Sequence, residues 1–184
     1  MITRSAYRAA QARAAQLLRR SGLALREEEL AQIAVADFGL GELEETGAQI
    51  LTLLDTAEIA VKLIVLFPGQ TLPQHRHPPL GAYPGKSETL RCAWGELSVC
   101  LEGAATDSLL ARPPLHRWRT YTVWEEHRLS AGDQITLAPN TWHWFQAGEE
   151  GAVVWSWSTR AVDVADEFVD PEIRRQTVVV EDAR

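Results

Sequence analysis

Eight short segments rich in apolar and β-branched residues fill most of the chain after residue 47, and they constrain its fold more than any other feature. Gly, Pro, Asn or Asp residues separate them, as is typical of strands joined by turns. They cover residues 48–54, 59–67, 88–93, 96–101, 120–129, 134–138, 142–147 and 151–159. Many short strands at close spacing predict an all-β sandwich or barrel.

The start of the chain has a different pattern. Residues 1–26 hold six arginines and no acidic residue. Apolar residues recur there at helical spacing, at Tyr7, Ala10, Ala14, Leu17 and Leu18. The pattern predicts a helix that docks on the rest of the molecule, with Ser5 as its N-cap and Gly22 as its stop. A transit peptide is the alternative interpretation. A second short helix is expected from Arg26 to about Val35.

We therefore divide the chain into an N-terminal helical segment (1–36), a β-barrel with a metal site (37–162) and a C-terminal tail (163–184). The stretches 78–86 and 104–119 contain prolines and are expected to be loops at the rim of the barrel. The tail is charged, and we expect it to wrap the surface or a partner subunit.

Composition excludes several classes of protein. The 184 residues include 18 basic and 25 acidic side chains, a net charge of −7, which argues against nucleic-acid binding. The longest apolar run is interrupted by Lys62 and Pro68, so we expect no membrane-spanning segment. Cys92 and Cys100 are expected to be reduced, buried thiols, which fits a cytoplasmic protein.

The strongest chemical signal is the pair His75 and His77. Alternate residues of a strand point to the same face, so the two imidazoles can bind one cation. Glu88 begins the next strand-like run, and His143 follows a predicted turn downstream. Three histidines and a carboxylate suit Mn²⁺, Fe²⁺, Co²⁺, Ni²⁺ or Zn²⁺ better than Ca²⁺. His116 and His127 lack such company and are interpreted as surface or loop residues.

Gly69, His75, His77, Glu88 and Gly95 together resemble the first motif of the cupin superfamily. The gap between His77 and Glu88 is longer than in the common form, which fits a loop insertion. The resemblance implies a double-stranded β-helix, a barrel like a jelly roll, with a metal held by His75, His77, Glu88 and His143.

Longer strings resemble the D-lyxose isomerase family of sugar isomerases. They are found at residues 37–41, 66–71, 85–86, 88–92, 121–124 and 143–154. The resemblance implies a homodimeric, manganese-type aldose–ketose isomerase. Its substrates would be D-lyxose and D-xylulose, or D-mannose and D-fructose.

Two further residues are assigned roles. Lys86 is the family's lysine near the site, and it would balance negative charge or take part in proton transfer. A solvated loop lysine is the alternative. Phe145 shares strand parity with His143, whereas Trp144 does not, so Phe145 is the predicted substrate-pocket residue.

One position departs from the family pattern. The family has a glutamate in the strand after Gly-Ala-Val-Val, and this chain has Ser156 there. A serine hydroxyl does not replace a carboxylate as a base without an activating partner. Acidic residues of the tail are the substitutes, namely Asp163, Asp166, Glu167 and Asp170.

Two other functions remain open at this stage. One is a sugar-binding cupin that kept its metal and lost turnover, which the serine at position 156 would explain. The other is a cupin dioxygenase, because such enzymes share the set of three histidines and one glutamate.

Overall fold

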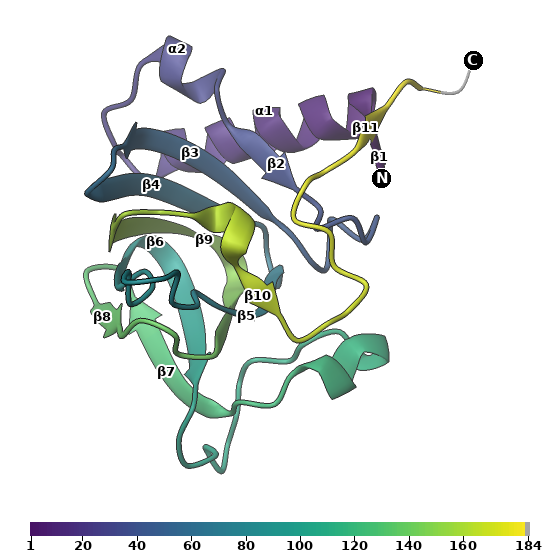
Figure 1. Cartoon of the computed structure of the whole chain (residues 1–184). Coiled ribbons are helices and arrows are strands. Elements are labelled where there is room, and N and C mark those ends of the chain that lie inside the picture. The colour runs from purple at the N-terminus through teal and green to yellow at the C-terminus, as the bar shows by residue number, and fades with distance from the viewer. Residues whose placement is uncertain (183–184) are drawn as a thin grey trace.

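The computed structural model describes residues 1–182, and strands dominate it (Figure 1). Nine of the strands form one curled antiparallel sheet, in which β10-β5-β9-β4-β3-β2 is the main order and β6 pairs with β7, β8 and β9. The strands are β2 (Ala34–Ala36), β3 (Ala48–Asp55), β4 (Ile59–Leu66), β5 (Thr71–Arg76), β6 (Glu88–Leu101), β7 (Glu125–Ser130), β8 (Gln134–Leu137), β9 (His143–Thr159) and β10 (Glu167–Phe168). The prediction of an all-β fold is confirmed.

Two long bent strands replace four of the predicted short ones. Residues 88–93 and 96–101 are parts of β6, and residues 142–147 and 151–159 fall almost entirely within β9. Their pairing changes register beside Gly95, whose φ is +75°. A Cβ on Gly95 would lie 2.1 Å from the Gly151 carbonyl oxygen, so the crossing of the two bends requires glycine.

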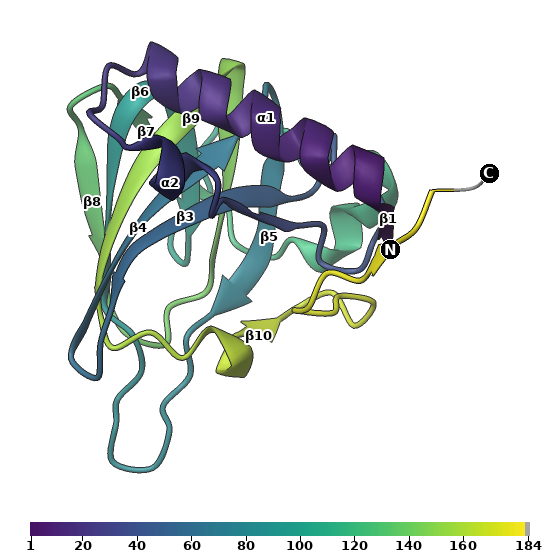
Figure 2. The same ribbon diagram turned by 90° about the horizontal axis from the view of Figure 1, so that it is seen from above.

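Helix α1 (Arg4–Arg20) lies along the outer face of the sheet (Figure 2). Its stripe Ala10, Ala14, Leu17 and Leu18 is buried, as predicted. Tyr7 packs beside the stripe and is partly buried. The same cluster includes Leu63 and Val65 of β4. The docking-helix interpretation is therefore the correct one for the fold.

Some predicted boundaries at this end are wrong. The N-cap of α1 is Thr3, whose hydroxyl accepts from the Ala6 amide at 3.2 Å, while the Ser5 hydroxyl donates to Asp182. The second helix, α2, covers only Glu27–Leu30. Residues 34–36 pair with β3 instead, because the sheet edge offers hydrogen bonds to that segment.

Two other segments also differ from expectation. Residues 115–120 form the 3₁₀ helix η1 (Leu115–Thr120), and β7 begins only at Glu125. Residues 71–76 form β5, although they were absent from the predicted strands. The connection between β5 and β6 projects from the barrel as a long loop, as expected (Figure 2).

The tail is more integrated than predicted. It forms the 3₁₀ turn η2 (Asp163–Ala165), then β10 against β5, and finally β11 (Val179–Val180), parallel to β1 (Ile2–Thr3). Ile173 is buried in the barrel core. No helix within residues 1–182 is long and apolar enough to cross a membrane.

Candidate metal centre and sugar site

Three predicted metal ligands meet at one end of the barrel. His75 near the end of β5 is the direct partner of His143 at the start of β9, and His77 follows β5. The ring centroids are 4.1 Å apart for His75 and His143, 5.0 Å for His75 and His77, and 5.1 Å for His77 and His143. Their candidate ligand nitrogens all lie within 4.8 Å of one another. The parity argument for the His75–His77 pair agrees with this arrangement.

The outer nitrogen of each ring has an oxygen partner. Nδ1 of His75 lies 2.9 Å from the Pro73 carbonyl oxygen, and Nδ1 of His143 lies 2.9 Å from that of Thr141. Nδ1 of His77 lies 2.8 Å from a carboxylate oxygen of Asp166. Donation from Nδ1 leaves a lone pair on Nε2 of each neutral ring, the arrangement usual in metal-binding histidines.

Nε2 of His143 is buried and has no hydrogen-bond partner among the described residues. Burial lowers the pKa of His143 to about 3, and burial together with the neighbouring histidines lowers the pKa of His75 well below its usual range. Both rings are therefore neutral at pH 7. Burial alone would lower the pKa of His77, but its contacts with Asp166 and Glu88 raise it. The converging nitrogens of the three rings fit a divalent transition-metal ion.

Glu88 is buried beside the three histidines. One of its oxygens, Oε2, lies 3.1 Å from His77 Nε2 and 3.3 Å from Lys86 Nζ, and the other accepts from the Ser156 hydroxyl. Burial alone would raise the pKa of Glu88, but the Lys86 charge and the His77 hydrogen bond hold it well below its usual range. An ionised carboxylate thus lies beside His77, while the cluster of converging ligand atoms consists of the three histidines.

Lys86 is 8% exposed, so it is not a solvated loop residue. Burial would lower its pKa, but Glu88, Asp163 and Asp166 together raise it. The residue therefore carries a buried positive charge next to the candidate metal ligands.

Phe145 lies where strand parity placed it. Its ring is parallel to that of His143 within 10°, with centroids 6.3 Å apart. It lines the same cavity as His75 and His77.

Comparison with known proteins places this site in a family. The family profile described as D-lyxose isomerase matches residues 116–184. The D-lyxose/D-mannose isomerase of Thermosediminibacter oceani is 46% identical over 175 residues, which are 95% of this chain and 97% of that protein. The D-lyxose ketol-isomerase of Thermofilum sp. is 42% identical over 98% of this chain and 100% of its own length. The chain belongs to the D-lyxose isomerase family.

Solved structures agree in fold. The L-ribose isomerase of Acinetobacter sp. DL28, in complex with L-ribose, has a TM-score of 0.79 at 19% identity, with 97% of this chain and 98% of that chain covered. The ligand-free L-ribose isomerase of Cellulomonas parahominis has the same TM-score at 20% identity and the same coverage. The cupin-type architecture expected from the sequence is confirmed.

The surroundings of Ser156 can now be described. Ser156 is buried on β9, and its hydroxyl is hydrogen-bonded to Glu88. Among the four tail acids, Asp163 and Asp166 line the cavity. The carboxylate of Glu167 instead pairs with Arg76 at 2.5 Å, and that of Asp170 with Arg117 at 2.8 Å. Only two of the four candidates therefore reach the site.

Sequence reasoning missed several residues of the cavity wall. The cavity is also lined by Phe38, Ile50, Lys62, Ile64, Leu72, Phe168 and Arg175. One of them carried a signal, because Lys62 is a charged residue at an inward position of an otherwise apolar strand. The sequence analysis treated it only as an interruption of an apolar run.

The remaining histidines and cysteines lie outside the site, as predicted. His116 is exposed and His127 is half-buried, and they pair with Glu42 and Glu125 at 2.9 and 3.2 Å. Cys92 and Cys100 are buried and free.

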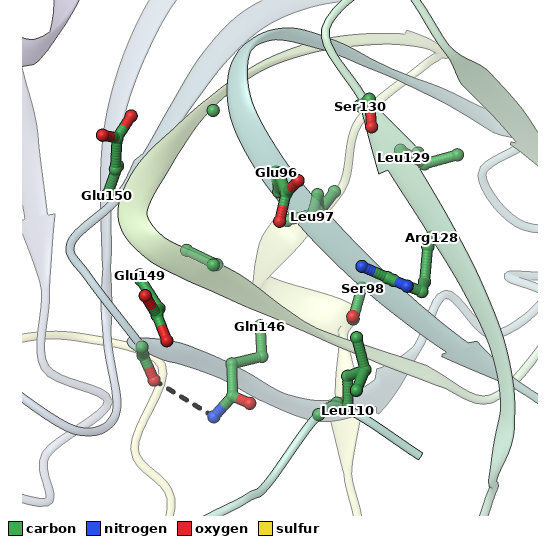
Figure 3. Close-up of a pocket in the computed structure, with 15 residues that line it drawn as sticks. Glu96, Leu97, Ser98, Leu110, Arg128, Leu129, Ser130, Gln146, Glu149 and Glu150 are labelled. Atoms are coloured by element: carbon green, nitrogen blue, oxygen red, sulfur yellow. Dashed lines mark hydrogen bonds between the residues drawn. The ribbon is translucent and has the colours of Figure 1, made fainter. Parts of the chain in front are cut away.

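A larger hollow lies elsewhere, where β6 and β9 bend (Figure 3). Its volume is about 980 Å³, and its lining includes Glu96, Arg128 and Gln146. Its lining contains no histidine and no residue of the ligand cluster, so size alone does not identify the reactive site in this molecule.

Proposed function

We propose that this chain is a metal-dependent aldose–ketose isomerase that interconverts D-lyxose and D-xylulose, with D-mannose and D-fructose as the second pair. One observation carries the proposal: the ligand nitrogens of three buried histidines lie within 4.8 Å of one another, with the ionised Glu88 beside His77, in a member of the D-lyxose isomerase family. The relatives named above supply the choice of sugars.

His75, His77, His143 and Glu88 would hold the ion, for which Mn²⁺ is our first choice and Zn²⁺, Fe²⁺, Co²⁺ and Ni²⁺ are alternatives. When bound, the ion would supply Lewis acidity toward the open-chain sugar. Asp166 orients His77, and the carbonyls of Pro73 and Thr141 orient the other two rings.

Isomerisation moves a proton between C2 and C1 through an enediolate. The buried ammonium of Lys86 lies 3.3 Å from Glu88 and therefore beside the candidate metal ligands. There it would balance the negative charge that develops on a sugar oxygen, or donate a proton to that oxygen. The Ser156 hydroxyl donates a hydrogen bond to Glu88, and a serine hydroxyl without an activating partner does not act as the base. Phe145 forms an apolar wall beside His143.

Carbon NMR tests this function directly. D-lyxose, D-mannose and D-xylose are incubated separately with the protein and Mn²⁺, with a chelator-treated sample beside each. Ketose that forms from lyxose or mannose only with the metal is the expected result. Unchanged sugars in every sample would refute the proposal.

The second candidate is a metal-containing sugar-binding cupin without turnover, which Ser156 favours because the family resemblance implies a glutamate at this position. Saturable sugar binding with no product after long incubation would identify it.

The proposal extends to a cytoplasmic homodimer, as the family resemblance implies. Light scattering tests the dimer, and a monomeric mass would remove that part.

A further inference from the structure

Lys62 is the one charged residue of β4, whose sequence is IAVKLIVL. It shares its strand face with Ile64 and Leu66, which belong to the barrel core, and its side chain is 9% exposed. Across the sheet it is the direct partner of Ser156. The strand therefore carries an ammonium group into the barrel interior at the level of the site.

The partner of Lys62 comes from the tail. Its Nζ donates to Oδ2 of Asp163 in η2, and Arg175 Nη2 lies 3.2 Å from the same oxygen. All three side chains line the cavity that His75 and Glu88 also line. Burial alone would raise the pKa of Asp163, but the charges of Lys62, Lys86 and Arg175 lower it. The Asp163 carboxylate is therefore ionised at neutral pH.

An ion pair in this position needs a reason beyond stability. Removing two charges from water costs free energy, and apolar side chains of similar volume often stabilise a fold as well or better. The neighbouring wall positions Ile50 and Ile64 show that this part of the barrel accepts apolar residues. The charges of Lys62 and Asp163 are therefore explained by binding of a ligand rather than by stability.

The pair forms a part of the wall separate from the ligand cluster. Within residues 1–182, neither Lys62 nor Asp163 forms a hydrogen bond or ion pair with the three histidines or Glu88. An ammonium donates hydrogen bonds and a carboxylate accepts them, and sugar hydroxyls do both. The lowered pKa of Asp163 makes it a poor base but leaves it a permanent acceptor.

We infer that Lys62 and Asp163 bind the hydroxyl groups at the end of the open-chain sugar remote from C1 and C2. This inference rests on the proposed function, because the histidines define where the reacting carbons lie. It makes the pair a specificity determinant for chain length and terminal hydroxylation.

The test compares D-lyxose with 5-deoxy-D-lyxose, which lacks the terminal hydroxyl, in the wild type and in Lys62→Met. The wild type should prefer D-lyxose by about 10- to 100-fold in kcat/KM, the effect of losing a hydrogen bond to a charged group. Lys62→Met should lose this preference, mainly through a higher KM, with kcat nearly unchanged. Asp163→Asn is the second variant and should give the same pattern if Lys62→Met does not fold.

Arg4→Met is the matched control, because it removes a cation from an exposed pair with Glu181. It should leave both sugars' kinetic constants unchanged. Thermal melting adds a readout: a purely structural pair predicts lower Tm in Lys62→Met and an unchanged sugar preference. That result, or a wild type that does not distinguish the sugars, overturns the inference.

Failure of the proposed function would look different. If the wild type isomerises neither sugar, calorimetry with the reduced, unreactive forms of both sugars measures binding alone. Tighter binding of the fully hydroxylated polyol to the wild type, and equal binding of both by Lys62→Met, would support the pair without catalysis. Equal binding of both polyols by the wild type would overturn it.

Discussion

The two walls of the site are held by different forces. On the strand wall, His75 and His143 are register partners, and each ring is tied to the carbonyl oxygen two residues before it. On the tail wall, Asp163 and Asp166 bond to side chains 101 and 89 residues away in the sequence, Lys62 and His77. The strand wall is thus set by local backbone geometry, and the tail wall by long-range charge pairing.

This difference separates two tasks. Metal binding needs neutral donors within a few tenths of an ångström of their positions, which sheet hydrogen bonds provide. Recognition of a flexible polyol needs groups that both donate and accept, and under our inference the charged pair of Lys62 and Asp163 would provide them. Figure 1 shows the tail passing β5 on its way to β1, so the second wall is added from outside the barrel.

Removal of a strand-wall ligand should have the largest effect. His143→Ala should lose bound metal and at least about 10³-fold of activity, because a Lewis acid contributes several kcal/mol to such reactions. Elemental analysis and the NMR assay measure both. His116→Ala, on the surface, is the control, and a fully active His143→Ala protein would contradict the assignment.

A change in the helix layer should affect stability without affecting either wall. Leu18 of α1 is fully buried, and Leu18→Ala should lower the free energy of unfolding by about 2–5 kcal/mol. Urea denaturation followed by tryptophan fluorescence measures the loss. Leu115→Ala, at an 89% exposed position, should change little. A changed KM in the folded Leu18→Ala protein would show that the packing of α1 is coupled to the site.

Removal of the tail's contact with the metal cluster should have an intermediate effect. Asp166→Ala frees Nδ1 of His77, so metal affinity should fall by about 10- to 100-fold. Competition with a metal-binding dye measures it. Glu167→Gln changes the next residue, whose partner is Arg76, and serves as the control. Equal affinities in the two variants would mean that the tail does not orient the histidine.

The smallest effect is expected where the tail is fastened to η1. Arg117 binds both Glu42 and Asp170, and its hydrogen bonds lower the pKa of Glu42 from 4.5 to about 2. The folded-state pKa is below the unfolded one, so this stabilisation is complete above pH 4.5 and disappears as the pH falls toward 2.

Glu42→Gln should therefore unfold more easily than the wild type at pH 7, by at most about 1 kcal/mol for a partly exposed pair. Denaturation curves from pH 7 to pH 2 should converge at the acid end. A difference that is constant with pH would show that the charge of Glu42 does not stabilise the fold through Arg117.

Local patterns predicted much of the strand wall. The alternation of His75 and His77, the following Glu88 and the turn before His143 identified side chains that the structure brings together. The periodicity of α1 identified its buried face. These predictions succeeded because each depends on neighbours within a few residues, where strand and helix geometry decide which side chains share a face.

Other features depended on distant partners. Ser5 and Thr3 are both acceptable caps by type, and contact of Ser5 with Asp182 accompanies the choice of Thr3. Residues 34–36 became a strand because β3 lies beside them.

The sequence by itself determined most of the barrel's strands, the buried face of the first helix and the set of metal-type ligands. Only the tertiary structure decided which of four tail acids reach the cavity, and that Lys62 pairs with one of them. The physical reason is that hydrophobic periodicity is a local property of the chain, whereas charge pairing across the barrel depends on which distant segments the closed sheet brings together.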